Sequence, residues 1–276
     1  MRRGPAYVLA CAIACGACSS SGDPGGSPGA ADAAPEADPG DAGQTPPPEA
    51  GADAADAGHD AAPPPGRYCT KLVPAPKFCD DFDDGDLTND WTQFAAAPGA
   101  VFELDTSTST SAPASFHVVA KATSAAASNN VLLRTTMLGA VKHGKLAFDV
   151  LLPTVTFDKG AVAIARFHVN LDDSFTLYLR GPDYAANVPM LEEYVGGNVT
   201  THMLTKLPAA GAWTRVTLDL DLAGGKASVS FGADKALDAS PIAVGAGSEA
   251  TVRLGAIVDG PADAFEARFD DVVVDF

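Results

Sequence analysis

The sequence predicts an all-β fold, an antiparallel β-sandwich, preceded by a signal peptide and a disordered tether. Three observations predict it. After residue 66, apolar and polar side chains alternate with a period of two, which is typical of half-buried strands. Glycine-rich turns separate these stretches, and helical periodicity is nearly absent. A short apolar N-terminus then leads into a segment of small and acidic residues, so we divide the chain into residues 1–18, 19–66 and 67–276.

Residues 1–18 have the features of a secretory signal peptide. Two arginines precede an apolar, small-residue run from Gly4 to Ala17. This run is shorter than the about 20 apolar residues that a membrane-spanning helix needs. Gly16-Ala17-Cys18 resembles a lipobox, which implies that Cys18 is acylated and becomes the mature N-terminus. Cys15 is the alternative acylation site. A second alternative is an ordinary signal peptide in which none of the cysteines is acylated.

Residues 19–66 predict a disordered acidic tether. They contain no Lys, Arg or aromatic residue and consist mainly of Ala, Pro, Asp, Gly, Ser and Glu. Such a segment cannot bury enough apolar surface to offset the entropy of ordering it. Its charge and prolines favour an extended chain with a reach of at least about 40 Å. We therefore expect an exported bacterial lipoprotein of the outer membrane or cell surface; Ser19 after Cys18 resembles the pattern of lipoproteins sent to an outer membrane.

The charge of the chain excludes some partners. The net charge is −17, from 18 Lys and Arg against 35 Asp and Glu. This acidic excess argues against nucleic acid and against direct binding to anionic lipid. The membrane is therefore expected as a partner only through the N-terminal lipid anchor.

The mature domain keeps two cysteines, Cys69 and Cys79. In an exported protein, a close pair of this kind most simply forms a disulfide. On the chain-entropy model, closing this short loop stabilises the domain by about 3 kcal/mol. Zinc ligation is the competing interpretation, but two cysteines without a nearby histidine make a poor zinc site.

Alternation then marks strands along the domain, in residues 116–120, in 145–152 and, most cleanly, in 213–222. In the last stretch Val216, Leu218, Leu220 and Leu222 share one face, with polar residues between them. This pattern predicts a half-buried antiparallel strand. Gly224-Gly225 supplies a turn, and residues 227–231 begin the return strand of a hairpin.

Three segments resemble the concanavalin A-like, laminin-G-like jelly rolls. Phe78-Cys79-Asp80-Asp81-Phe82, with Trp91 shortly after, resembles their opening strand. Phe269-Asp270-Asp271-Val272-Val273-Val274-Asp275 is similar to their closing strand, and the hairpin after Trp213 to their penultimate hairpin. The resemblance implies a jelly roll over residues 67–276 in which the first and last strands are neighbours.

Two enzyme groups on this fold have motifs that can be sought here. Laminarinase-type glycoside hydrolases have a Glu-x-Asp-x-x-Glu strand, and the nearest segment starts at Glu103 but has Thr108 at the final position. Retaining hydrolysis needs two carboxylates about 5 Å apart, so that mechanism loses one partner. Alginate-lyase-type relatives use an Arg-rich strand, a Gln-x-His element and a downstream Tyr, and no segment of this chain reproduces that set. We name no catalytic residue.

A polar patch is expected on one sheet face. In residues 162–171, alternation directs Phe167, Val169 and Leu171 to the core and the intervening polar residues to the other face. The next two strands repeat this division. If the three strands are neighbours, their outward side chains form a candidate ligand-binding set: Arg166, His168, Tyr178, Arg180, Glu192 and Tyr194.

This set suits a sugar, since an aromatic side chain can pack on a pyranose ring while arginine binds an acidic substituent. We therefore expect a surface-tethered domain that binds carbohydrate, with polysaccharide as partner, or serves adhesion, and that is not an enzyme. One alternative is a polysaccharide-degrading enzyme, a lyase or glycosidase, on the same fold. Another is a structural envelope protein without a ligand, whose sheet face is merely solvated with its charges paired across strands.

A structural calcium ion is the one cofactor that the sequence predicts. Residues 80–86 contain five aspartates, and Asp270-Asp271 lies near the C-terminus. Clusters of carboxylate oxygens suit calcium, and the jelly-roll resemblance implies a calcium site near the paired end strands. We expect Asp81 and Asp271 as ligands; the alternative is that these carboxylates are only solvated.

Overall fold

The computed structural model describes residues 67–124, 128–181 and 188–276. The predicted signal peptide, the acylation site Cys18 and the tether lie outside the described residues. Within the described part, no helix has the length and apolar character needed to cross a bilayer.

The described chain is built from strands, with one short 3-10 helix, η1 (Cys69–Lys71), ahead of them. The stretches in which alternation predicted strands, residues 116–120, 145–152 and 213–222, are strands apart from the last residue of the second and third. In chain order the strands are β1 (Phe78–Asp80), β2 (Gln93–Ala96), β3 (Val101–Asp105), β4 (Ser115–Ala120), β5 (Val131–Val141), β6 (His143–Leu151), β7 (Ala161–Val169), β8 (Asp173–Arg180), β9 (Met190–Val195), β10 (Asn198–Met203), β11 (Trp213–Asp221), β12 (Lys226–Phe231), β13 (Asp234–Pro241), β14 (Gly247–Asp259) and β15 (Phe265–Asp275).

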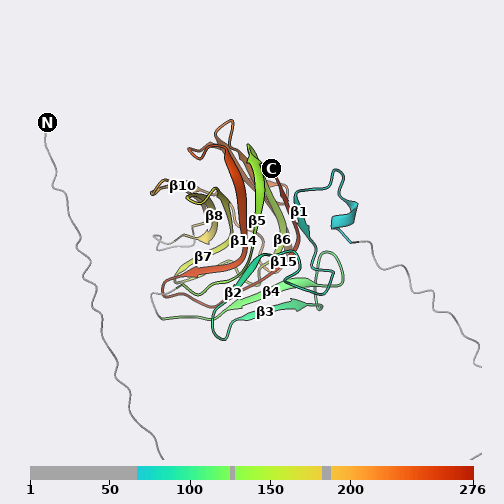
Figure 1. Ribbon diagram of the computed structural model, residues 1–276. Coiled ribbons are helices and arrows are strands. Elements are labelled where there is room, and N and C mark those ends of the chain that lie inside the picture. The colour runs from blue at the N-terminus through green and yellow to red at the C-terminus, as the bar shows by residue number, and fades with distance from the viewer. Residues whose placement is uncertain (1–66, 125–127, 182–187) are drawn as a thin grey trace, which may run out of the picture. The chain divides into compact units, whose positions relative to one another are not determined.

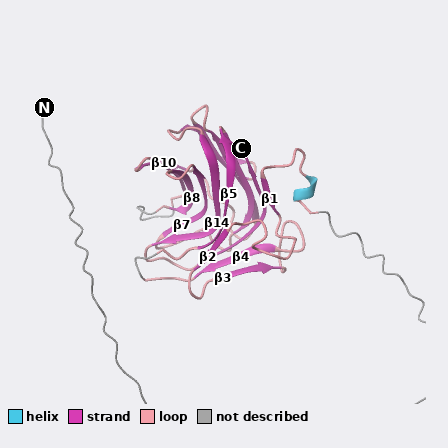
Figure 2. Cartoon of the chain, in the orientation of Figure 1, coloured by secondary structure: helices cyan, strands magenta, loops and turns pink. Residues whose placement is uncertain are grey.

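These strands form two antiparallel sheets packed as a sandwich (Figure 1). One sheet has the order β13-β12-β11-β6-β15-β4-β3, with β1 also paired to β15. The other has the order β10-β9-β8-β7-β14-β5-β2. Figure 2 shows the strands as the dominant structure and the loops at their ends. The predicted all-β sandwich is confirmed.

The two ends of the domain lie side by side. β1 pairs with β15, with Cys79 opposite Val273, so the expected adjacency of the first and last strands is confirmed. The predicted disulfide between Cys69 and Cys79 is also present, and it ties η1 to β1. The indole N–H of Trp91 donates to the carboxylate of Asp80 at 2.6 Å.

The core lies between the sheets. In β11, Val216, Leu218 and Leu220 are buried as the alternation predicts, and β12 returns beside them. Phe167 of β7 and Phe175 of β8 enter the core from the second sheet, and both are fully buried. Burying a side chain of this kind contributes roughly 1.5–3 kcal/mol. These inward residues also decide which side chains of the second sheet face outward.

The predicted burial of Leu171 is wrong. Leu171 was expected to follow Phe167 and Val169 into the core, but it is 82% exposed. β7 ends at Val169, and Asn170 has φ of 65°, in the left-handed region that asparagine tolerates. The chain therefore turns at Asn170, and the alternation does not extend to Leu171.

Candidate functional site

Two rows of side chains cross the outer face of the second sheet. In the first row, Arg253 of β14 lies opposite Arg134 of β5 on one side and Arg166 of β7 on the other. Strands in a sheet are about 4.8 Å apart, so three guanidinium groups start from backbone positions within about 10 Å. The same row continues through Thr176 of β8 to Glu192 of β9.

The second row lies two residues along each strand. It runs from Thr251 through His168 and Ser174 to Tyr194. His168 is two residues beyond Arg166 on β7, so the two side chains share a face about 7 Å apart along the strand. Strand pairing thus places a histidine and a tyrosine beside the arginines.

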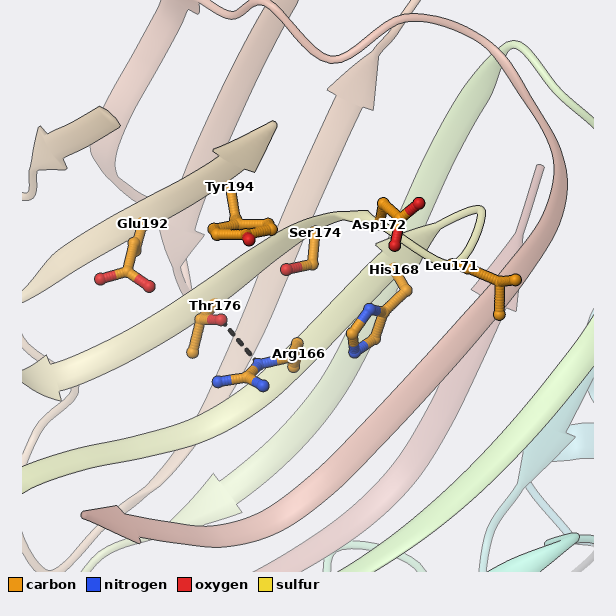
Figure 3. Close-up of a pocket in the computed structure, with 8 residues that line it drawn as sticks. All are labelled: Arg166, His168, Leu171, Asp172, Ser174, Thr176, Glu192 and Tyr194. Atoms are coloured by element: carbon orange, nitrogen blue, oxygen red, sulfur yellow. Dashed lines mark hydrogen bonds between the residues drawn. The ribbon is translucent and has the colours of Figure 1, made fainter. Parts of the chain in front are cut away.

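The rows line two hollows that meet at His168 and Leu171. The first, of about 240 Å³, is lined by Arg166, His168, Leu171, Asp172, Ser174, Thr176, Glu192 and Tyr194 (Figure 3). The second, of about 160 Å³, is lined by Arg134, His168, Asn170, Leu171, Glu249, Thr251 and Arg253. We call the two hollows together the arginine groove.

The arginines of the groove are held in place but incompletely paired. Arg166 Nε donates to Thr176 Oγ1 at 2.8 Å, and Arg134 donates to the side-chain oxygen of Gln93 at 3.0 Å. The Nε atoms of Arg134 and Arg253 are buried and have no hydrogen-bond partner among the described residues. Burial, followed by the charges of Arg166 and Arg134, lowers the pKa of Arg253. Because it contains three arginines, this cluster is positive, although the whole chain is strongly acidic.

His168 is kept neutral by these surroundings. Burial, then the positive charges of Arg253, Arg166 and Arg134, lowers its pKa to about 4. Its Nε2 atom is buried and has no hydrogen-bond partner among the described residues. At neutral pH the imidazole can therefore accept a proton.

The structure brings together four of the six predicted ligand-binding residues: Arg166, His168, Glu192 and Tyr194. The other two lie apart from both hollows. Tyr178 is 4% exposed and packs in a small apolar cluster that includes Met190 and Ile257. Burial, then the charge of Glu192, raises its pKa to about 12.

Arg180 is the other residue that does not line the groove. Its guanidinium donates to the backbone carbonyls of Gly160 at 2.5 Å and Asp158 at 3.3 Å, so it braces the start of β7. Its position in β8 is on the sheet face that the alternation predicts. The nearby loop carbonyls, which the sequence pattern does not reveal, accept from its Nη1 and Nη2 atoms, while its buried Nε has no hydrogen-bond partner among the described residues.

Among the groove residues that sequence reasoning missed, Arg134 and Arg253 are the positively charged ones. Each is the charged residue in an otherwise apolar stretch of strand, with buried neighbours Leu133 and Leu254. That alternation was available in the sequence. What was not available is that β14 lies between β5 and β7 and sets the arginines side by side.

The predicted calcium ligands act as hydrogen-bond acceptors. Asp81 Oδ2 accepts from the backbone N–H of Cys69 at 3.0 Å, and the Asp271 carboxylate accepts from the hydroxyls of Ser111 at 2.7 Å and Thr110 at 3.1 Å. Within the described ranges, no three His, Cys, Asp or Glu side chains are grouped in a way that could hold a metal ion. Calcium therefore stays a prediction.

Comparison with known proteins yields structural similarity only. No protein-family model matches the chain, and no curated protein matches it by sequence. An endo-β-1,4-glucuronan lyase from the fungus Trichoderma reesei is similar in structure, with a TM-score of 0.56 and 14% identity over 72% of this chain and 95% of that chain. A cellulose-induced protein, Cip1, has a TM-score of 0.55 and 15% identity over 71% of this chain and 96% of that chain.

These similarities show that the domain shares the β-sandwich jelly-roll fold of these two proteins. They also correct the first functional expectation. A non-enzymatic domain for carbohydrate binding or adhesion was expected, and that expectation is wrong, because the fold is shared with an enzyme, the glucuronan lyase.

Proposed function

We propose that this domain is a polysaccharide lyase that cleaves a uronate-containing polysaccharide by β-elimination in the arginine groove. The observation that carries the proposal is the in-register row of Arg134, Arg253 and Arg166 beside the neutral His168. The fold shared with a glucuronan lyase supports it.

The arginine row suits the first requirement of β-elimination, which is to bind and neutralise the uronate carboxylate. A planar guanidinium matches a carboxylate with two parallel hydrogen bonds. Removing the proton on the carbon next to the carboxylate puts negative charge on that group. Cationic donors fixed before the reaction stabilise this charge as it develops. Arg134 and Arg253 both line the second hollow, where they would meet such a carboxylate.

His168 suits the role of general base. The α-proton moves to the neutral imidazole, the electron pair of the broken C–H bond forms a carbon–carbon double bond, and the C–O bond at the β-carbon breaks. A base must be unprotonated at the working pH, as His168 is with a pKa of about 4; a uronate carboxylate bound to the arginines would offset the positive charges that lower this pKa and so strengthen the base.

Tyr194 suits the role of general acid toward the leaving oxygen. A phenol donates a hydrogen bond and a proton. Tyr194 is 38% exposed and lies in the same row as His168, two strands away, or about 10 Å across the sheet. The leaving oxygen is bonded to the carbon next to the one that loses its proton, so His168 and Tyr194 must lean toward each other over one glycosidic bond to act in the same elimination.

The proposal is tested by incubating the full chain with polyglucuronate, polymannuronate, polygalacturonate and a neutral glucan. We expect ultraviolet absorbance from an unsaturated uronate with at least one polyuronate and none with the glucan, and product masses without added water. His168→Ala should lose at least about 100-fold in rate, as expected for a general base. An absence of unsaturated product both from every polyuronate and from an alternating copolymer of glucuronate and N-acetylglucosamine, or an unchanged rate in His168→Ala, would refute the proposal.

We also propose that the chain is exported and held at a membrane through lipid on Cys18. The signal-like N-terminus and the resemblance to a lipobox support this. Incorporation of labelled palmitate into the wild type, lost in Cys18→Ala, tests it. Label retained in Cys18→Ala and lost in Cys15→Ala would move the anchor to Cys15.

We also propose that a calcium ion binds Asp81 and Asp271 and stabilises the folded domain. Asp83 lies beside them: burial, then the charges of Asp81 and Asp271, raises its pKa to about 6. A bound cation would offset this repulsion. We expect excess calcium to raise the unfolding temperature relative to a chelator; equal unfolding temperatures would contradict the idea.

A further inference from the structure

The two halves of the arginine groove differ in charge. The hollow on the β5 and β14 side has two arginines, Arg134 and Arg253, against one acidic residue, Glu249. The hollow on the β8 and β9 side has one arginine against two acidic residues, Asp172 and Glu192. The excess charge therefore changes sign along the groove, from positive to negative.

The asymmetry follows from strand order. Along the first row, positive side chains occupy three adjacent strands, and Thr176 and then Glu192 occupy the next two. Arg253 and Glu192 are three strands apart, or about 14 Å. This separation exceeds the width of one pyranose ring, so neighbouring sugars of one chain would lie in different halves.

We infer that the groove takes a heteropolymer in which a uronate is joined to an uncharged sugar, rather than a run of consecutive uronates. The inference rests on the proposed function and specifies its substrate class. The uronate would lie over the arginine half, and the uncharged sugar over the half that contains Glu192 and Tyr194.

The acidic half disfavours a second uronate. A carboxylate placed there would face Glu192 and Asp172 at close range, and like charges in a partly buried site repel. The negative charge of Glu192 already acts on its neighbours, since it contributes to the raised pKa of Tyr178. The single arginine of this half, Arg166, is turned toward Thr176 by its Nε hydrogen bond.

The same half favours an uncharged sugar. Carboxylate oxygens accept hydrogen bonds from sugar hydroxyl groups without a charge penalty. Tyr194 stands at the rim with its ring partly exposed, and Glu192 and Ser174 lie near it on the same face (Figure 3). An aromatic ring flanked by hydrogen-bonding groups is the usual setting for a pyranose with an apolar face.

The test compares two polymers with the same linkage position: a glucuronate homopolymer and an alternating copolymer of glucuronate and N-acetylglucosamine. We expect the full chain to cleave the copolymer with a kcat/KM at least about 10-fold higher, equivalent to about 1.4 kcal/mol. In Glu192→Gln this ratio should fall at least about fivefold. Asp172→Asn is the second variant, and Asp238→Asn, an exposed residue of β13 on the other sheet, is the matched control with an unchanged ratio.

Two results separate the inference from the proposed function. Equal or better cleavage of the homopolymer, with a ratio unchanged in Glu192→Gln and Asp172→Asn, overturns the inference and leaves the lyase proposal standing. If neither polymer yields unsaturated product, the lyase proposal fails, and calorimetry with tetrasaccharides of both kinds decides the inference. Tighter binding of the alternating tetrasaccharide, weakened relative to the other in Glu192→Gln, supports it, and equal binding overturns it.

Discussion

Replacing the central arginine of the row, Arg253→Gln, should lower activity while leaving the domain as stable as before or more stable. Arg253 has the other two arginines opposite it on the neighbouring strands, and its Nε is buried without a hydrogen-bond partner among the described residues. Such a group adds little to folding. It is well placed to bind a carboxylate.

The expected changes in kcat/KM and in stability can both be estimated from this arrangement. A hydrogen bond to a charged group contributes about 1.5–3 kcal/mol, so losing the contact with a uronate lowers kcat/KM by about 10- to 150-fold. In the free protein, guanidinium groups on neighbouring strands start about 4.8 Å apart and can splay to about 7 Å. At that distance two like charges repel by roughly 2 kcal/mol at an effective dielectric constant of about 20. Lost packing of the side-chain stem offsets part of this relief. A net gain of about 1 kcal/mol would raise the unfolding temperature by about 2–4 °C for a domain of this size.

The assay measures unsaturated product and thermal unfolding on the same preparations. Lys235→Gln, an exposed residue of β13 on the other sheet, removes one positive charge away from the groove and should change neither quantity. The reasoning is refuted if Arg253→Gln unfolds several degrees earlier than the wild type while kcat/KM stays the same. That outcome would make Arg253 a structural residue.

Three further predictions concern pH, the disulfide and the buried side of β9. The pKa of His168 is about 4 in the folded state against an ordinary value of 6.5, so its contribution to stability is complete above pH 6.5 and is lost as pH falls to about 4. Activity should fall over the lower part of that range. In His168→Gln, the free energy of unfolding should depend less on pH between those limits. The double change Cys69→Ser and Cys79→Ser should lower the free energy of unfolding by about 3 kcal/mol in urea titrations, and a loss below about 1 kcal/mol would show that the loop is held by other contacts. Glu193 is 1% exposed, binds His202 at 3.1 Å and accepts hydrogen bonds from the backbone N–H groups of Ala243 and Val244. Glu193→Ala should therefore lower the free energy of unfolding by about 3–5 kcal/mol in the same titrations, and Glu193→Gln should lower it less. Equal losses in the two variants would contradict a role for the side-chain oxygens.

Features that depend on a local pattern of residues could be predicted from the sequence. Period-two alternation predicts the buried face of β11, because successive side chains of a strand point to opposite sides. The close cysteine pair predicts the disulfide of the exported domain. Alternation also places Arg166, His168, Glu192 and Tyr194 on outward faces, and all four line the groove. It fails at Leu171, where a turn at Asn170 ends the strand.

Which strands are neighbours is known only from the three-dimensional fold, and this adjacency creates the site. β14 follows β5 and β7 by a long stretch of chain, yet it lies between them and brings Arg253 beside Arg134 and Arg166. Alternation tells which way a side chain points but carries no information about the strand beside it. The order of strands depends instead on burying the inner faces of both sheets in one core. The charge reversal along the groove and the neutrality of His168 both follow from that order.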